Sequence, residues 1–599
     1  MTEIKQQFIQ VKTKSNFETR LNAGDVKDTS IAFIEDSDQI WTKGKYYSAV
    51  PKEGHEKQIL AWKASGEAKW EDLANMFTGL EEVLAYGVQF DSTVADPHLT
   101  RIGNMSLHKS LPIQSQLKGC IAQDTKVMYW LNESDWRFRK EAVTQDVTLT
   151  VSDDTYTLTA DVFGTLQYDK QWVKIDSVAC QISSIDTTNK VATLIANDDL
   201  KALSLESGTK SIELGAVLNG YDGTVRVYCP AFYIKSVTEG TVSKVWLSTV
   251  KIDDSYTYQP EILVDAYRST VLNAVPENMG YLSTLAVNSA ISVVNTNTYC
   301  RGGGNRSAND KYLTTDPFRT DLGKPKTAIS RASMRTYSRN ANSYMLSYDQ
   351  YKNIFYWLYV VEYANFNSQE AYNATLTDDG YRQGGLGNGI TTWDGSSWSL
   401  YNGYYPITPC GYGNTLGNKT GILDLIIPEY TYGSGSTGSS KTFSMPRWRG
   451  FDNPFGDIWT NLDGIVIDTP LAGKSDPSIQ PTCYIITDPD NYTDSLSGIE
   501  EKADRSYKQA HNEGYTKEWH LGSSADIVPK AVGGDTTQYM CDYYWVNYND
   551  TPETLFVGGS AHDGAHSGLG TFDSNDGVGY SYTNVGFRSV SAFVVVGAL

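Results

Sequence analysis

Histidine is the side chain best suited to acid–base and metal chemistry near neutral pH, and this chain contains few. The seven are His55, His98, His108, His511, His520, His562 and His566. His562 and His566 are four residues apart, which on a helix would place two metal ligands on one face. They lie in the sequence GGSAHDGAHSGLG, whose glycines favour a loop. We therefore expect exposed loop histidines here and no metal site.

Other motifs for catalysis are weak or missing. No glycine-rich loop ends in Lys-Ser/Thr, and no serine occupies a nucleophile elbow. The pairs Asp153-Asp154 and Asp198-Asp199 lack the alternating spacing of a calcium loop, so we interpret them as turn residues. Carboxylate pairs occur in any acidic chain and do not indicate a glycosidase. The sequence predicts a protein that is not an enzyme and uses no cofactor.

Aromatic and small polar residues gather in the last third of the chain, where their chemistry suits recognition of sugars or proteins. Aromatic faces stack on sugar rings, and Asn, Asp and His satisfy hydroxyl groups. The predicted ligand-binding residues are Tyr543, Tyr544, Trp545, Asn547, His562, Asp563, His566, Tyr580, Tyr582 and Asn584. A second candidate patch comprises Trp393, Trp398, Tyr401, Tyr404 and Tyr405. The alternative for each single residue is a plain solvated loop position.

The amino-acid composition limits the classes of partner that the protein is expected to bind. The 599 residues include 50 Lys+Arg and 70 Asp+Glu, and the resulting net charge of −20 would repel a nucleic-acid backbone. Tyr outnumbers Phe 40 to 18, as is typical of binding surfaces. The seven cysteines are far apart, which favours scattered buried thiols over a disulfide framework or a zinc site.

Targeting signals are also missing. The N-terminal sequence MTEIKQQFIQVKTK lacks the apolar run of a signal peptide. No stretch reaches the roughly 18 apolar residues that a spanning helix needs, so we expect no membrane insertion. We expect the protein to be made and kept in a cytosol-like compartment, or released from it without secretion.

The elements that must position these residues suggest an α+β, β-rich fold in five segments. These are a small N-terminal β module at 1–60, a short helical stem at 61–85, the first part of the main unit at 86–140, an inserted acidic β domain at 141–222, and the main unit at 223–599. The insertion holds 13 acidic and 5 basic residues and alternates like short strands.

Local patterns predict individual elements. Asp36-Ser37-Asp38 separates two short apolar stretches, which predicts a hairpin. Apolar residues from Trp70 to Leu84 recur at spacings of three and four, which predicts a helix, either packed on its own domain or serving as an oligomerisation stem. Further helices are predicted from Ile329 to Asn340 and from a cap at Ser347 or Asp349 through YKNIFYWLYVVEYA, the latter buried because it is apolar nearly all round. The C-terminal FRSVSAFVVVGAL predicts a buried final strand.

Three motifs of the last third resemble the C-type-lectin-like fold of the formylglycine-generating/sulfatase-modifying type. The first is VVEYANFNSQ at 360–369. The middle signature, Arg-Gly-x-x-Asn-x-x-Gly-x-x-Trp, matches Arg449, Gly450, Asn453, Gly456 and Trp459. The late signature matches Gly558-Gly559-Ser560 and Gly586-Phe587-Arg588. The chain more closely resembles the version found at the tips of phage receptor-binding proteins, including those diversified by retroelements. Within this fold we expect Arg588, Trp459 and Phe455 to be core residues.

Earlier segments, 90–120 and 227–270, resemble fibre proteins of gut Bacteroidetes phages, crAss-like and related, and 31–48 resembles their virion-anchoring module. The resemblance implies a homotrimeric head or tail fibre or spike, located in the virion and made in the host cytoplasm. Its N-terminus would dock on capsid or tail proteins. Its C-terminal C-type-lectin-like domain, 223–599, would bind host-surface polysaccharide or protein.

Two alternatives stay open: a structural head-decoration protein without receptor binding, and a capsule-degrading or modifying enzyme. A lectin secreted by a bacterium is disfavoured by the missing signal peptide. The oxidase chemistry of the enzymatic relatives needs a cysteine pair near the C-terminus, but the last cysteine is Cys541. The calcium-dependent sugar motifs of animal lectins, Glu-Pro-Asn and Trp-Asn-Asp, are absent as well.

Overall fold

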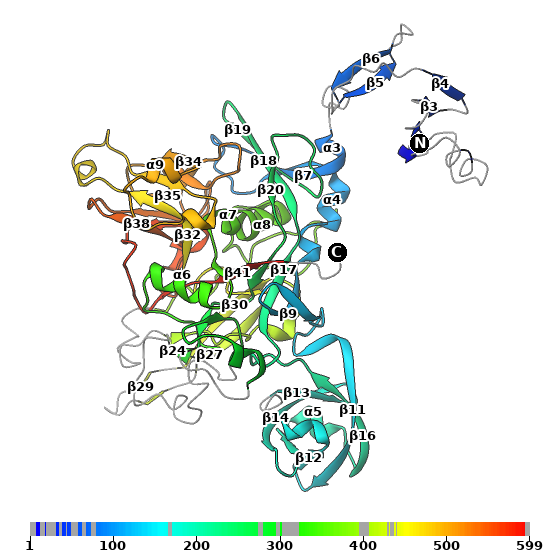
Figure 1. Cartoon of the computed structure of the whole chain (residues 1–599). Coiled ribbons are helices and arrows are strands. Elements are labelled where there is room, and N and C mark those ends of the chain that lie inside the picture. Colours follow the sequence, from blue (N-terminus) through cyan, green and yellow to red (C-terminus); the bar gives the residue numbers. More distant parts are fainter. Residues whose placement is uncertain are drawn as a thin grey trace. The chain divides into compact units, whose positions relative to one another are not determined.

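The computed structural model divides the chain into two compact units, residues 1–80 and 81–599 (Figure 1). Before residue 80 the described residues are 8–11, 18, 31–34, 39–42, 45–48, 58–62 and 68–72. From residue 80 to 593 all are described except 166–170, 273–278, 295–299, 302–322, 394–405, 428–429, 432–436 and 439. Strands dominate this part of the chain and helices are few, so the predicted β-rich class is confirmed.

The N-terminal unit contains two small sheets. A four-stranded sheet has the order β1-β2-β3-β4, formed by Phe8–Val11, Ile31–Ile34, Gln39–Thr42 and Lys45–Ser48. Strands β2 and β3 are antiparallel with Phe33 opposite Ile40, so the predicted hairpin is present. Its turn residues, Asp36-Ser37-Asp38, lie outside the described residues.

The predicted helix from Trp70 is wrong at its start. Residues Ala68–Asp72 form strand β6, which pairs with β5, Gln58–Trp62, and places Trp70 opposite Leu60. Trp and Ile, which occur in these two segments, are residue types enriched in strands, and this favours a hairpin where the spacing alone suggested a helix. Residues 73–79 lie outside the described residues, and only Glu81–Leu84 (α3) is helical. Within the described residues of 61–85, the predicted helical stem is therefore wrong at 61–62 and 68–72, which are strand.

Two antiparallel sheets begin the second unit. One has the order β20-β18-β19-β7-β8, with bounds Thr257–Gln259, Phe232–Glu239, Val242–Ser248, Ala85–Asp91 and Thr100–Gly103. The other has the order β10-β9-β17-β21-β41-β25, with bounds Lys126–Trp130, Lys118–Gln123, Thr224–Cys229, Ile262–Asp265, Ser589–Ala592 and Tyr344–Met345. The strand near the C-terminus, β41, is largely buried between two neighbours, as predicted.

Between β10 and β17 in the sequence, the chain leaves the second sheet and forms a closed six-stranded barrel. Its strands are β11 Phe138–Ser152, β12 Thr155–Thr159, β13 Trp172–Ile175, β14 Val178–Asp186, β15 Val191–Leu194 and β16 Gly208–Gly215, with α5 Asp198–Ala202 beside them. The barrel encloses an apolar core of its own. The last barrel strand ends at Gly215, whereas the insertion was expected to extend to residue 222. The difference arises because Ala216 and Leu218 pack into the main core.

A nine-stranded sheet carries the candidate site. Its main path is β34-β33-β32-β38-β39-β37-β35-β36, and β40 pairs with β32. The bounds are β32 Trp459–Asp468, β33 Thr482–Ile485, β34 Arg505–Lys508, β35 Gly514–His520, β36 Val528–Val532, β37 Tyr543–Val546, β38 Pro552–Gly558, β39 Gly568–Ser574 and β40 Val585–Gly586.

Short elements complete the unit. A three-stranded sheet contains β27 Gly421–Ile427, β30 Lys441–Trp448 and β31 Phe451–Asp452. Two-stranded pairs are β22 Thr270–Val271 with β23 Ala290–Ile291, β24 Cys300–Arg301 with β26 Pro406–Ile407, and β28 Tyr430–Thr431 with β29 Thr437–Gly438. Short helices are α4 Met105–Ser110, α9 Ile499–Lys502, η1 Gln114–Gln116, η2 Asp161–Gly164, η4 Gly280–Thr284, η7 Asn414–Leu416, η8 Leu471–Lys474, η9 Pro489–Asn491 and η10 Gly564–His566.

The two predicted longer helices are present. Helix α6, Arg331–Asn340, begins after its cap Ser330. The apolar segment forms α7 Tyr348–Tyr351, a π-helical segment η5 Lys352–Trp357 and α8 Leu358–Tyr363, capped reciprocally by Ser347 and Gln350. Helices α7 and α8 lie between β7 and β32 at the centre of the unit (Figure 1). Every residue of η5 and α8 is buried, so this segment forms the middle of the core.

Two further expectations concern cysteines and membrane spans. Cys120, Cys180, Cys229, Cys410, Cys483 and Cys541 are separate buried thiols, as predicted, and the side chain of Cys300 lies outside the described residues. No helix within the described residues combines the length and apolar character needed to cross a membrane.

Candidate functional site

Four side chains form a cluster that we call the aromatic surface: Tyr515, Tyr543, Trp545 and His566. The His566 ring centroid lies 4.2 Å from that of Tyr543, 5.4 Å from that of Tyr515 and 5.5 Å from that of Trp545. The rings of Tyr543 and Trp545 are 4.6 Å apart. All four residues are partly exposed, so solvent reaches rings that their neighbours hold in place. The structure thus brings three predicted residues together and adds Tyr515.

Strand register explains the cluster. Strands β35 and β37 are antiparallel and place Tyr515 opposite Tyr543. Because successive strand residues point to opposite faces, Tyr543 and Trp545 share one face of the sheet. Strand β39 runs parallel to β37 on its other side and places Asp573 beside Trp545. The site is therefore built on three hydrogen-bonded strands, and His566 reaches it from η10, just before β39.

Two buried rings connect this surface to a tyrosine pair, Tyr580 and Tyr582. Trp459 packs edge-on against Trp545 at 5.4 Å, and its ring lies 6.4 Å from that of Phe556. Phe556 in turn lies 5.8 Å from Tyr580, which is 6.1 Å from Tyr582. Trp459 and Phe556 are buried, whereas the Tyr582 side chain is 47% exposed. The predicted residues Tyr580 and Tyr582 thus belong to the same run of rings.

Acidic residues lie beside this run of rings. Asp573 is buried, and its burial and the nearby Asp576 carboxylate hold the pKa of Asp573 well above its usual range. Burial also raises the pKa of Asp576 to about 6. Glu553 is fully buried, and burial raises its pKa; Oε1 accepts from Thr551 at 3.1 Å, and Oε2 has no hydrogen-bond partner among the described residues. These carboxyl groups take up protons more readily than exposed ones do.

Burial lowers the pKa of His566, although Asp563 and Glu513 oppose that effect. The ring is therefore mostly neutral at pH 7 and offers one donor and one acceptor. Neutral imidazole, phenol and indole groups provide flat apolar area together with hydrogen-bonding edges. This combination suits a ligand that has both C–H faces and hydroxyl groups.

The loop before η10 is closed by its own side chains. The backbone N–H and Oγ of Ser560 both donate to Asp563 Oδ2 at 2.7 Å. His562 Nδ1 lies 3.1 Å from Ser560 Oγ, and His562 Nε2 lies 3.7 Å from Asp563 Oδ1. The residue types match a Ser-His-Asp triad, but Ser560 is fully buried and its hydroxyl donates directly to the aspartate. These contacts close the loop on itself, and the buried Ser560 hydroxyl is not placed to act as a nucleophile.

The structure corrects two of the predicted ligand-binding residues. Tyr544 is fully buried because alternation along β37 turns it away from Tyr543 and Trp545, and its hydroxyl donates to Ala510 O at 3.1 Å. Asn584 is only 7% exposed because it precedes β40, and its carbonyl accepts from Trp459 N at 2.8 Å. Neither side chain belongs to the aromatic surface.

The remaining predicted residues lie apart from the aromatic rings. Asn547 is exposed just after β37, and its Oδ1 accepts from Tyr548 N at 2.9 Å. In the second candidate patch, Trp393 is buried and stacks on Phe443 at 5.0 Å. Trp398, Tyr401, Tyr404 and Tyr405 lie outside the described residues.

The middle and late signatures meet beneath the site. Gly456 N donates to Gly558 O at 2.9 Å, and Trp459 pairs with Val585 at the start of β40. Arg588 is buried and donates to the backbone oxygens of Asp265, at 3.0 Å, and Asn453, at 3.4 Å. As expected, Arg588, Trp459 and Phe455 are core residues.

No group of three His, Cys, Asp or Glu side chains among the described residues has the geometry to hold a metal ion. Neither a protein-family model nor a curated protein sequence matches the chain.

Proposed function

We propose that this chain is a subunit of a phage fibre or spike, on the head or tail, and that its aromatic surface binds glycan on the bacterial host. Its N-terminal unit docks on a capsid or tail protein. The subunits associate as a homotrimer in the virion, so that several weak sites act together. The resemblance of the motifs to phage receptor-binding tips supports the virion assignment.

The observation that carries the binding proposal is the cluster formed by Tyr515, Tyr543 and Trp545 on the paired strands β35 and β37 with His566 from η10. Rings held by a sheet lose little freedom when a sugar stacks on them, so little of the binding energy is lost to ordering. Partial exposure leaves area for contact, and the neutral His566 and the tyrosine hydroxyls can bond sugar hydroxyl groups.

The experiment measures binding of the full chain to cells of the host bacterium. We expect Trp545→Ala together with Tyr543→Ala to abolish most binding, and periodate treatment of the cells to do the same because it destroys vicinal diols. Tyr258→Ala is the matched control, since Tyr258 is 53% exposed on β20, outside the aromatic surface. Undiminished binding by the double variant would contradict the proposal.

A further inference from the structure

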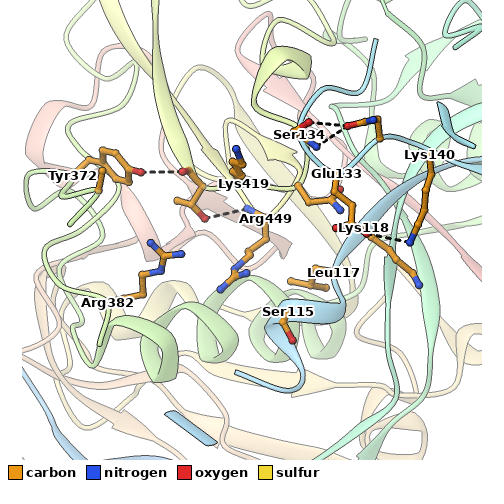
Figure 2. Close-up of a pocket in the computed structure, with 14 residues that line it drawn as sticks. Ser115, Leu117, Lys118, Glu133, Ser134, Lys140, Tyr372, Arg382, Lys419 and Arg449 are labelled. Atoms are coloured by element: carbon orange, nitrogen blue, oxygen red, sulfur yellow. Dashed lines mark hydrogen bonds and ion pairs between the residues drawn. The ribbon is translucent and has the colours of Figure 1, made fainter. Parts of the chain in front are cut away.

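A hollow in the 81–599 unit shares no lining residue with the aromatic surface. Its volume is about 880 Å³, which is within the range of small-molecule and oligosaccharide sites. Figure 2 shows the fourteen residues that line it, which include the basic residues Lys118, Lys140, Arg382, Lys419 and Arg449. The fourteen residues come from seven separate stretches of sequence, so no local pattern reveals this basic pocket.

The charge of the basic pocket is opposite to that of the chain. Five lining residues are Lys or Arg and one, Glu133, is a carboxylate, although the whole chain carries −20. Glu133 is matched by Lys140, with Nζ and Oε1 3.1 Å apart. A concentration of positive charge in a hollow of an acidic protein attracts anions selectively, because the surrounding surface repels them.

Two guanidinium groups in the wall share one carboxylate. Arg449 Nη2 lies 2.6 Å from Glu362 Oε1, and Arg382 Nε lies 3.6 Å from the same oxygen. Trp448 Nε1 also donates to Glu362 Oε2 at 3.2 Å. Glu362 is buried in α8, so the carboxylate fixes both arginines while neutralising only one. One positive charge therefore remains beside the cavity, held in position.

Lys118 and Lys419 add further positive charge from other directions. The Lys118 ammonium lies 4.1 Å from the centre of the Trp130 ring, an aromatic contact that restrains the side chain. Lys419 is exposed at the rim. In Figure 2 Lys118 and Lys140 lie on the opposite side of the drawn residues from Arg382, and Lys419 lies near Arg449. An anion inside would thus be contacted from more than one side.

Neutral donors and acceptors fill the rest of the wall. The Tyr372 hydroxyl donates to Thr420 O at 2.9 Å. Asn418 Oδ1 accepts from Trp136 Nε1 at 2.8 Å and from Gly119 N at 3.0 Å, which fixes its amide and leaves the NH₂ group to donate to a ligand. Ser115, Asn132 and Ser134 also line the pocket, and the Ser134 hydroxyl donates to Asn132 Oδ1 at 2.8 Å. Such a wall suits a ligand with many hydroxyls as well as charge.

We propose that the basic pocket binds an acidic oligosaccharide, one whose sugars carry carboxylate, sulfate or phosphate groups. The cations select the charge, and the hydroxyl and amide groups bond the ring hydroxyls. This site does not depend on the virion assignment or on the aromatic surface. Nucleic acid is a poorer match, because a long polyanion would also meet the negative surface of the chain.

The test is calorimetric titration of the full chain with an oligogalacturonate, a chondroitin sulfate oligosaccharide, a maltooligosaccharide of equal length and a single-stranded oligonucleotide. We expect the acidic sugars to bind and the neutral one not to. Affinity should fall when the salt concentration is raised from about 0.05 to about 0.3 M. The carboxylate and sulfate arms show which anionic group is preferred.

Two variants localise the binding. Lys419→Glu should weaken binding of the acidic sugars by about tenfold, because it replaces an attraction of the anion by a repulsion. Lys474→Glu is the matched control, an exposed lysine in η8 outside the basic pocket, and should bind as the wild type does. Equal binding of the neutral sugar, tighter binding of the oligonucleotide, or an unaffected Lys419→Glu variant would overturn the proposal.

Discussion

Tyr515 and Tyr543 face each other across antiparallel strands β35 and β37, with ring centroids 5.1 Å apart and planes at 85°. Edge-to-face is one of the arrangements that aromatic pairs prefer, and here it leaves part of each ring open to solvent. His566 closes the third side, 4.2 Å from Tyr543. A pair of this kind needs no ligand to set its geometry, so the proposed glycan site would be preorganised for binding.

Trp545→Phe and Trp545→Ala should differ in binding more than in stability. Trp545 is partly exposed and packs on Trp459 at 5.4 Å. Phenylalanine keeps a stacking face, so we expect Trp545→Phe to keep most of the glycan binding and Trp545→Ala to lose it. Thermal unfolding should show both variants folded, with Trp545→Ala destabilised by about 1–3 kcal/mol. Equal binding by the two variants would exclude stacking at this position.

The pKa of Asp576 predicts a pH-dependent stability difference. Burial raises that pKa from 3.8 to about 6, so between these values the folded chain holds a proton that the unfolded chain has lost. Stability therefore falls as the pH rises from about 4 to 6 and stays reduced above that range. Asp576→Asn removes the titrating group, so its melting temperature should exceed that of the wild type at pH 7.

The same difference should vanish below about pH 4, where Asp576 is protonated in both states. Asp161→Asn is a useful comparison, because Lys190 lowers the pKa of Asp161 and the sign of its effect at neutral pH should be the opposite. A gain for Asp576→Asn that is constant at every pH would show that the burial of a charge is not its cause.

Gly568→Ala should be strongly destabilising. A Cβ at this position would lie 1.6 Å from Asp542 Oδ1, and its φ of 154° is one that L residues rarely adopt. Asp542 cannot easily move, because it is buried and its Oδ2 accepts from Gly570 N at 2.7 Å. We expect a loss of about 1–3 kcal/mol or more in denaturant unfolding. Gly579→Ala is the control, since a Cβ there meets nothing within 4 Å.

Local sequence signals predicted some of these features and missed others. Ser347 and Gln350 lie three residues apart before an apolar run, so the start of α7 and its burial could be predicted. Tyr515 could not, because its contact with Tyr543 depends on the pairing of β35 with β37. Tyr544 was misassigned because its neighbours are all aromatic or apolar, which hides the alternation. The basic pocket combines residues from 115 to 449, a set that only the tertiary fold brings together.

We expect the rest of the 81–599 unit to fold without the barrel. Val143 on β11 and Leu214 on β16 are antiparallel partners, so a short turn can join them. Replacing residues 144–213 with a glycine-rich turn should leave the rest of the unit folded, because the barrel has a separate core. Circular dichroism and the main thermal transition measure this. Loss of that transition would show that the barrel is needed to fold the sheet it interrupts.

The Glu362→Gln variant tests whether a carboxylate in the core controls the charge of the basic pocket. The change removes the carboxylate that Arg382 and Arg449 share, and leaves two guanidinium groups without compensation in a largely buried place. Breaking a buried pair in this way costs about 3–5 kcal/mol. An anion in the pocket can replace part of the lost charge. Inorganic phosphate, titrated at constant ionic strength, should therefore raise the melting temperature of Glu362→Gln more than that of the wild type.

Lys419→Glu in the Glu362→Gln background is the control for that experiment. It lowers the positive charge of the pocket without touching the arginines, so the extra stabilisation by phosphate should shrink. If phosphate stabilises the wild type, the single variant and the double variant equally, the anion acts on the protein surface in general. The shared carboxylate would then be a purely structural contact, because its removal would not have made the pocket a stronger anion site.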